Sequence, residues 1–577
     1  MVHHRFALPV LSLLVAAACQ PPAPPEGAGA EGDRQYDVII SGGKIIDGTG
    51  NPWFHGDLAI SGDRIARITP PGMLAKAAAT RRIDATGKVV APGFIDIQAQ
   101  SVQAFTIGDG RVISSVTQGI TTAVLGEGAT PAPSNDKIIA SAAGYEAVMK
   151  PVLEQFRGPR GFNAWLEAME KHGTSQNVAS FLGAATPRVY AKGEAQGPAT
   201  AAELDSMRAV VRNAMEDGAL GIASALIYPP ANYASTEELI ELSKVMAPFG
   251  GVYITHMRSE ADRFLEALDE AIRIGKEGGV PVEVFHLKAS GTKNWGKMPL
   301  AIAKIDSARA AGQDVTADMY LYTAGGTALA ACAPPWAAAD GKLLDNLRDP
   351  ATRARIKAEI LAPVGDNEGL CTLGGPGMVQ VVGFTKAELK RYEGQRLDAI
   401  ARAMKMDWPD ALFEIVLAEN AAIGAIFHMM TESKLPLQIR QPWIKWGTDA
   451  DGMNPDSTGG LLAHPRAYGN YPRLLGRYVR EQKVISLEEA IRKGTSAVAR
   501  RLFIRDRGIL ESGAYADVIV FDPNTIIDRA AFEVPHQLSV GVEQVLVNGQ
   551  AVVTDGKHTN AKPGRLVRGP GWTGWNR

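Results

Sequence analysis

The sequence predicts an α/β protein built on a (β/α)8 TIM barrel, with a β-sandwich formed from both chain termini and an insertion near the barrel mouth. Short apolar runs of strand length alternate with helical segments over roughly 400 residues, a rhythm that favours a closed parallel barrel. Strand-and-turn sequence occurs on both sides of this region, at 35–90 and 508–565. Each side holds too few strands for a stable sheet, so we expect the two sides to pair.

The residues before the globular part have the pattern of an export signal. A short basic region, 3–5, precedes the apolar run 6–18, which is too short to span a membrane, and Cys19 follows. The sequence Ala16-Ala17-Ala18-Cys19 resembles a bacterial lipobox, in which the cysteine becomes the lipidated first residue. We expect a signal peptide at 1–18 and a flexible tether at 19–34. The protein would then be exported, as a periplasmic protein or a membrane-anchored lipoprotein held through Cys19.

Composition is that of an ordinary globular protein. The 577 residues carry a net charge of −2, with 46% hydrophobic and 21% charged residues. This balance gives no electrostatic reason to expect a nucleic acid or an anionic membrane surface as a partner. Cysteines 19, 332 and 371 fit no zinc-binding spacing, and we do not expect Cys332 and Cys371 to form a disulfide.

The strands of the sandwich are expected in hairpins. Segments 36–40 and 44–46 flank a Ser41-Gly42-Gly43 turn, and a second hairpin covers 57–68. Further strands are expected at 88–90, 516–521 and 543–547.

Residues 91–507 form the predicted barrel. Its expected strands are short apolar runs, at 121–125, 178–182, 251–255, 282–285, 314–317 and 444–447. Ser235 with Glu238, and Ser486 with Glu489, have the spacing of capping boxes that begin helices, and 262–278 has apolar residues at helical spacing. The stretch at about 333–410 interrupts this rhythm and is interpreted as an insertion that covers the barrel mouth.

Two of the ten histidines directly follow expected barrel strands. His256 ends the run 253–256, and His286 comes thirty residues later, which is about one βα unit. Both imidazoles should therefore lie at the C-terminal ends of neighbouring strands, the face on which barrel enzymes build active sites. Because neutral imidazole is the commonest metal ligand, we predict that both bind a metal. His428, in an apolar run typical of a helix, is expected to be packed.

Asp449 has a comparable position, after the apolar run 443–446. A carboxylate beside a metal can take a proton from water and return it to a leaving amine. The alternative for Asp449 is a helix N-cap before Gly452.

Motifs in a fixed order extend along the globular part. They include Ala91-Pro92-Gly93-Phe94-Ile95-Asp96, Leu226-Ile227-Tyr228-Pro229-Pro230, Thr255-His256-Met257-Arg258-Ser259-Glu260, His286-Leu287-Lys288, Gly447-Thr448-Asp449-Ala450 and His464-Pro465-Arg466-Ala467-Tyr468-Gly469. In these motifs, from about residue 36 to 570, the chain resembles the N-acyl-D-amino-acid deacylases of the metal-dependent amidohydrolase superfamily.

The resemblance implies roles for six residues. His256 and His286 would bind zinc, and Asp449 would be the catalytic acid and base. Tyr228, Lys288 and Arg466 match positions that hold the substrate's carboxylate or polarise its carbonyl, and a guanidinium suits a carboxylate well through its bidentate geometry.

The chain departs from the superfamily pattern at two ligand positions. Gln98-Ala99-Gln100 stands where His-x-His is usual, and since an amide is a poor zinc ligand we expect the first metal position to be empty. Where the family carries a cysteine ligand, counting back from Ala132-Pro133 gives Glu127, whereas counting forward from the strand gives Gly128. We favour Glu127, because a carboxylate can supply the third ligand of a catalytic zinc site.

These expectations combine into a hydrolase that holds one Zn2+ per chain through Glu127, His256 and His286. It would cleave the amide bond of N-acylated amino acids with a free carboxylate, of D configuration by resemblance alone, using metal-activated water. Two alternatives stay open. The chain could be a cyclic-amide or small-peptide amidohydrolase on the same scaffold, or a degenerate non-catalytic binding lipoprotein that has lost its metal.

Overall fold

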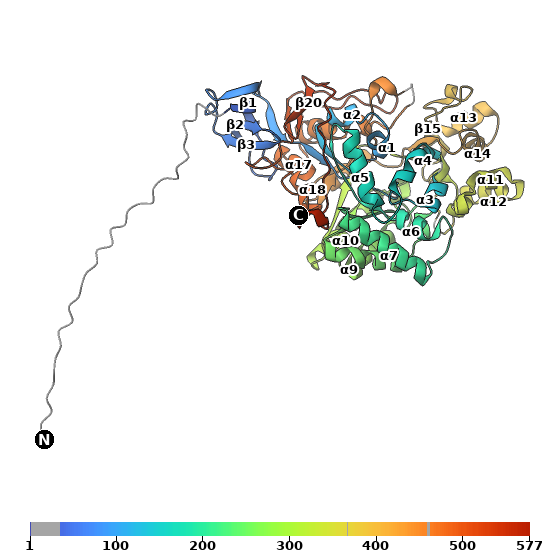
Figure 1. The fold of residues 1–577 in the computed structure, drawn as a ribbon. Helices are drawn as coiled ribbons and strands as arrows, with labels where there is room; N and C mark the ends of the chain where they lie inside the picture. The colour runs from blue at the N-terminus through green and yellow to red at the C-terminus, as the bar shows by residue number, and fades with distance from the viewer. Residues whose placement is uncertain (2–34, 143, 366, 459–461, 577) are drawn as a thin grey trace.

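The computed structural model describes residues 1, 35–142, 144–365, 367–458 and 462–576 (Figure 1). The predicted signal peptide and tether, with Cys19, lie outside the described residues. No helix among the described residues has the length and apolarity needed to cross a membrane.

Parallel strands close into the predicted barrel. Its strands are β6 (Phe94–Asp96), β7 (Ile120–Leu125), β8 (Asn177–Ser180), β9 (Leu182–Gly183), β10 (Gly221–Ala225), β11 (Val252–His256), β12 (Val282–Val284), β13 (Val315–Met319) and β17 (Ile444–Trp446). Only Phe181 separates β8 from β9, and a parallel bridge between Ala99 and Ala450 links the β6 end of the ring to the β17 end. The predicted TIM barrel is confirmed.

Helices on the outside of the barrel follow from local sequence. The main ones are α5 (Gly161–His172), α7 (Ala201–Glu216), α8 (Thr236–Met246), α9 (Phe264–Gly278), α10 (Met298–Ala310) and α17 (Leu487–Gly494). Ser235 and Ser486 cap α8 and α17, since each hydroxyl accepts the N–H of the residue three positions on. These caps were expected, and they fix where each helix begins.

Strands from both termini form one nine-stranded sheet beside the barrel (Figure 1). In spatial order they are β21 (Lys557–His558), β20 (Gln550–Thr554), β19 (Val542–Val547), β18 (Val518–Phe521), β5 (Val89–Pro92), β1 (Gln35–Ile45), β2 (Phe54–Ser61) and β3 (Arg64–Thr69), with β4 (Ala78–Asp84) also paired to β1. The antiparallel pairing of β18 with β5 joins the two ends of the chain.

The expected hairpin at 41–43 is wrong, because β1 runs through this segment as one strand. Its register against β2 shifts between Ile40 and Gly43, and Gly42 has a φ of 73°. Glycine adopts this left-handed conformation without strain, so the strand bulges there instead of reversing.

The segment between β13 and β17 contains the insertion, drawn in yellow and orange in Figure 1. It holds an antiparallel sheet in the order β14 (Gly325–Ala328), β16 (Gly424–Phe427), β15 (Val379–Val382), and the helices α11 (Leu343–Arg348), α12 (Pro350–Leu361), α13 (Leu397–Met404) and α14 (Trp408–Ala418). The insertion is therefore wider than 333–410. It contacts loops that follow barrel strands: the Tyr233 hydroxyl donates to the Pro335 carbonyl (3.0 Å), and the Gly291 N–H to that of Met429 (2.9 Å). His428 directly follows β16. It does not lie in a helix, contrary to the expectation from sequence.

Cys332 and Cys371 form a disulfide inside the insertion, contrary to expectation. The two residues are 39 positions apart in sequence, and the insertion's own fold brings their Cα atoms to 5.4 Å. Spacing alone could not show this proximity. Closing a loop of this length restricts the unfolded chain, which stabilises the folded insertion by about 2–4 kcal/mol.

Candidate metal centre

The three side chains predicted to bind the metal lie together at the barrel mouth. His256 is the last residue of β11, His286 lies two residues after β12, and Glu127 lies in the loop after β7. One ligand atom from each lies within 4.8 Å of the others, and the two histidines are buried. The C-terminal ends of parallel strands thus supply all three, as expected of a barrel active site.

The distances in this cluster fit a zinc ion. Glu127 Oε1 is 3.2 Å from His256 Nδ1 and 3.4 Å from His286 Nε2. Zinc–ligand bonds of about 2.0–2.2 Å in a tetrahedral arrangement separate neighbouring ligand atoms by about 3.3–3.6 Å. The imidazole rings stand at 89° to each other with centroids 4.4 Å apart, so both can direct a nitrogen at one point. Two imidazoles and a carboxylate are a donor set that catalytic zinc sites use.

The other oxygen of Glu127 is held by two amides. Gln98 Nε2 and Gln100 Nε2, just after β6, donate to Glu127 Oε2 at 2.5 and 2.6 Å. These are the glutamines that replace the usual His-x-His. Their amides satisfy one oxygen of the nearly buried carboxylate by hydrogen bonding, and leave Oε1 facing the imidazoles.

Burial and neighbouring charge perturb both histidines. Burial lowers the pKa of His256. Burial and the Lys288 ammonium would lower the pKa of His286 as well, but the carboxylates of Glu260 and Glu127 outweigh them and raise it to about 10. Burial alone would raise the pKa of Glu127, whereas its hydrogen bonds with the two imidazoles hold that pKa well below the usual value. Without a metal, His286 is therefore protonated at neutral pH.

Asp449 lies beside the cluster, three residues after β17, and caps no helix. Its Oδ1 accepts a long hydrogen bond from Gln100 Nε2 (3.3 Å), and its Oδ2 lies 2.8 Å from Arg466 Nη1. Its φ of 49° is unusual for an aspartate, and the Asp449 N–H is held by the Gln98 carbonyl at 2.8 Å. The N-cap alternative is excluded. The Asp449 side chain is connected to the metal cluster by Gln100, whose Nε2 donates to both Asp449 and Glu127.

Asp96 supports this loop and was missed as a functional residue. Its carboxylate accepts hydrogen bonds from the Thr448 N–H (2.8 Å) and hydroxyl (2.5 Å). Burial raises the pKa of Asp96 to about 6 despite these bonds. The available signal was its place at the end of the motif 91–96, directly before the Gln98–Gln100 segment.

The three predicted substrate-binding residues differ in their surroundings. The Tyr228 ring packs edge-on against His256, with centroids 5.3 Å apart, and Arg466 begins α16 (Arg466–Arg473) and stacks on Tyr320 at 4.5 Å. Lys288 contacts the opposite side of His286 from Glu127, with its ammonium 2.6 Å from Glu260. Tyr320 and Glu260 were missed, although each follows an expected strand within five residues.

Similar proteins give this geometry a context. Residues 444–553 match the amidohydrolase family. The chain is 33% identical to a D-aminoacylase of Alcaligenes xylosoxydans xylosoxydans. The alignment covers 93% of this chain and 99% of that protein. With 30% identity and a TM-score of 0.75, 93% of the chain superposes on all of an N-acyl-D-glutamate deacylase from Bordetella bronchiseptica, solved with zinc and a phosphonate mimic of the tetrahedral intermediate. A D-aminoacylase with a binuclear metal centre, activated by one metal and attenuated by the second, matches with 33% identity and a TM-score of 0.74 over 92% of this chain and 100% of that one.

We predict that zinc binding at pH 6.5 releases about one proton per chain. Ligation needs a neutral His286 nitrogen, whereas the pKa of His286 without metal is about 10, so a proton must leave. For the same reason zinc affinity should fall as the pH is lowered, by about tenfold per pH unit in the range where the proton on His286 is the only one that the metal displaces. Calorimetric titration in two buffers of different ionisation enthalpy measures the number of protons released per zinc ion bound. A value near zero would mean that His286 is already neutral.

Proposed function

The chain belongs to the D-aminoacylase family of metal-dependent amidohydrolases, which act on amide C–N bonds, and from this premise we propose its specific reaction. We infer that it is a mononuclear zinc hydrolase that removes the acyl group from N-acyl-D-amino acids with a free α-carboxylate. The observation that carries this proposal is the zinc-compatible triangle of Glu127, His256 and His286, with Asp449 beside it. The relatives named as deacylases of D-amino acids support the substrate class.

A zinc ion held by these residues would polarise the scissile carbonyl and lower the pKa of the attacking water. The protein's own residues supply the rest. Asp449 takes a proton from the water and delivers it to the departing amine. Its Oδ2 is fixed by Arg466, while the long bond from Gln100 leaves Oδ1 able to accept a proton. The Tyr228 ring packs against His256, and we assign to its hydroxyl the role of stabilising the oxyanion.

Arg466 is the group best suited to the substrate carboxylate. It is buried, and its Nε has no hydrogen-bond partner among the described residues, although its Nη1 is paired with Asp449. A buried donor without an acceptor is costly, and a carboxylate would satisfy it. Lys288 is less available, because its ammonium already contacts both Glu260 and His286. The carboxylate anchor therefore rests mainly on Arg466.

The two glutamines support a single metal per chain. Gln98 and Gln100 stand where imidazoles would be needed to bind a second ion, and both of their amides donate to Glu127 instead. We propose that this chain keeps the activating metal of its relatives and lacks the attenuating one.

For localisation we propose export, with anchoring through a lipid on Cys19. The disulfide between Cys332 and Cys371 supports an oxidising compartment, since such bonds persist outside the cytosol.

Metal analysis of the purified protein should give about one zinc per chain. Changing Gln98→His together with Gln100→His should raise the content toward two, because imidazoles replace poor ligands. As a control, Gln176→His alters a buried glutamine that bonds Ser115 and Ile120 elsewhere in the barrel, and it should leave the content at one. Two equivalents in the wild-type protein would contradict the proposal.

Asp449→Asn should keep the zinc and lower kcat by at least about 100-fold, the usual scale of general acid–base catalysis. Asp456→Asn, in the same loop but paired with Arg111 at the surface, is the matched control and should retain the rate. Steady-state kinetics with zinc analysis checks both. A near-normal rate for Asp449→Asn would show that the proton moves through another group.

The substrate class is tested with four compounds: the N-acetyl derivatives of one amino acid in D and L form, and their methyl amides. The D acid should be hydrolysed with a kcat/KM at least about 100-fold above that of its methyl amide, because the amide leaves a buried donor unpaired. Arg466→Ala should abolish most of this difference. Equal rates for acid and amide in the wild type would remove the carboxylate anchor, and preference for the L form would overturn the assigned chirality.

Cys19→Ser should release the protein from the membrane fraction, because Cys19 is the predicted site of lipid attachment. Fractionation followed by immunoblotting checks this. A variant that stays membrane-bound would show that the lipobox interpretation is wrong.

A further inference from the structure

We infer that Glu260 is a positioning residue of the metal centre, which fixes the ring nitrogen of His286 that carries the proton. Its carboxylate holds the proton on Nδ1, so that Nε2 is left to bind the metal. The inference rests on the proposed zinc site and assigns to Glu260, and to its contact with Lys288, a role in metal affinity.

Two carboxylates face opposite sides of the same pair of imidazoles. Glu127 Oε1 faces His256 Nδ1 and His286 Nε2, at 3.2 and 3.4 Å. Glu260 faces the other nitrogen of each ring: its Oε1 is 3.0 Å from His286 Nδ1, and its Oε2 is 3.6 Å from His256 Nε2. Glu260 is only 4% exposed, so water does not compete for these contacts. The nitrogens that face Glu127 form the metal cluster. Glu260 lies within hydrogen-bond distance of His286 Nδ1, whereas His256 Nε2 is too far away to bond it.

A neutral imidazole has one N–H and one lone pair, and the metal needs the lone pair. For His286 the proton must therefore be on Nδ1, where an acceptor stabilises it. Two groups lie close to Nδ1: Glu260 Oε1 at 3.0 Å and the Lys288 ammonium at 2.8 Å. Lysine can only donate, and a bond from Lys288 to Nδ1 would move the proton to Nε2 and block the metal. Glu260 and Lys288 thus favour opposite tautomers.

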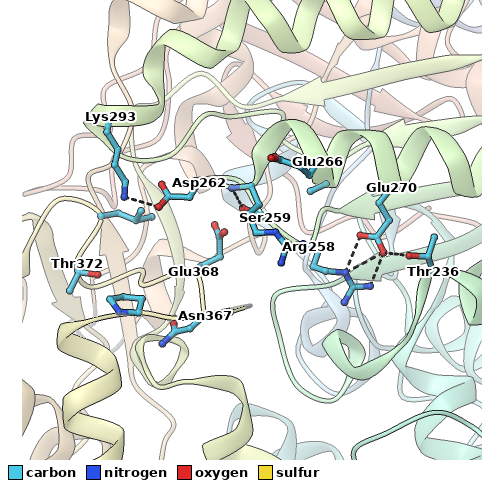
Figure 2. Close-up of a pocket in the computed structure, with 15 residues that line it drawn as sticks. Thr236, Arg258, Ser259, Asp262, Glu266, Glu270, Lys293, Asn367, Glu368 and Thr372 are labelled. Atoms are coloured by element: carbon cyan, nitrogen blue, oxygen red, sulfur yellow. Dashed lines mark hydrogen bonds and ion pairs between the residues drawn. The ribbon is translucent and has the colours of Figure 1, made fainter.

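Glu260 prevails because it also binds Lys288. The ammonium donates to Glu260 Oε1 at 2.6 Å, so its charge is satisfied without the imidazole. The backbone of Glu260 is fixed on both sides: its N–H donates to Glu368 of the insertion at 3.0 Å, and its carbonyl accepts the Ser290 N–H at 2.7 Å. Glu368 and Ser259 both line a cavity of about 550 Å3, whose lining side chains are drawn in Figure 2. The insertion thereby helps to hold the acceptor in place.

The test is zinc affinity, measured by competition with a chelator. Glu260→Gln removes the charge and should weaken zinc binding by about 10- to 100-fold, the usual effect of losing such a partner of a ligand histidine. The matched control is Glu238→Gln, which breaks another buried ion pair, with Arg188 at 2.7 Å, and should leave zinc affinity unchanged. Equal losses in both variants would show a general effect of destabilisation and overturn the inference.

A double variant separates the tautomer from simple charge. Lys288→Met alone should change zinc affinity less than about threefold, because Glu260 still accepts the Nδ1 proton. Added to Glu260→Gln it should restore most of the lost affinity, since the competing donor is gone. Additive effects would overturn the inference.

If Glu260→Gln does not fold, Glu260→Asp takes its place. Its carboxylate reaches less far toward Nδ1, so zinc should still bind more weakly, and unchanged affinity overturns the inference.

The same measurements separate this inference from the proposed function. Wild-type protein that binds no zinc would contradict the proposed function. Tight zinc binding by the wild type that Glu260→Gln leaves unchanged would contradict only the role of Glu260.

Discussion

The carboxylate of Glu127 is the group on which the site depends. A buried carboxylate is stable only when hydrogen bonds and positive charge replace the lost water. Two amides satisfy one oxygen, and two imidazoles face the other. Gln98, Gln100 and Glu127 therefore act together. The two amides, which are poor metal ligands, orient the carboxylate that is proposed to bind the metal.

The barrel strands make this arrangement possible, because they hold strained backbone in place at the metal site. His286 and Asp449 both have positive φ, 33° and 49°, which costs energy for residues other than glycine. Buried hydrogen bonds compensate: Asp318 Oδ1 accepts the His286 N–H at 2.8 Å, and the Gln98 carbonyl accepts the Asp449 N–H at the same distance. In this conformation His286 faces Glu127, and Asp449 contacts Gln100. The strain is tolerated because the ends of the parallel strands hold the backbone in place.

Periodicity and strand-end position sufficed for the barrel, the terminal sheet and the placing of His256 and His286, because these depend on local pattern. Counting along the loop left Glu127 and Gly128 open. The chemistry of a carboxylate favoured Glu127, and the structure brings its two oxygens to the glutamine amides and to the imidazoles. The disulfide forms between segments that the fold of the insertion brings together. The contact of Glu260 with His286 forms between loops that meet at the barrel mouth. Such contacts are set by packing between distant segments, which no spacing in the sequence encodes.

We propose that one metal is bound by one carboxylate oxygen and two imidazoles. Anomalous diffraction at the zinc edge from crystals of the zinc-loaded protein tests it most directly. The account predicts a single peak, about 2 Å from Glu127 Oε1, His256 Nδ1 and His286 Nε2, with both glutamine amides still on Glu127 Oε2. A second peak beside Gln98 and Gln100, or a zinc ion without Glu127 among its ligands, would contradict it.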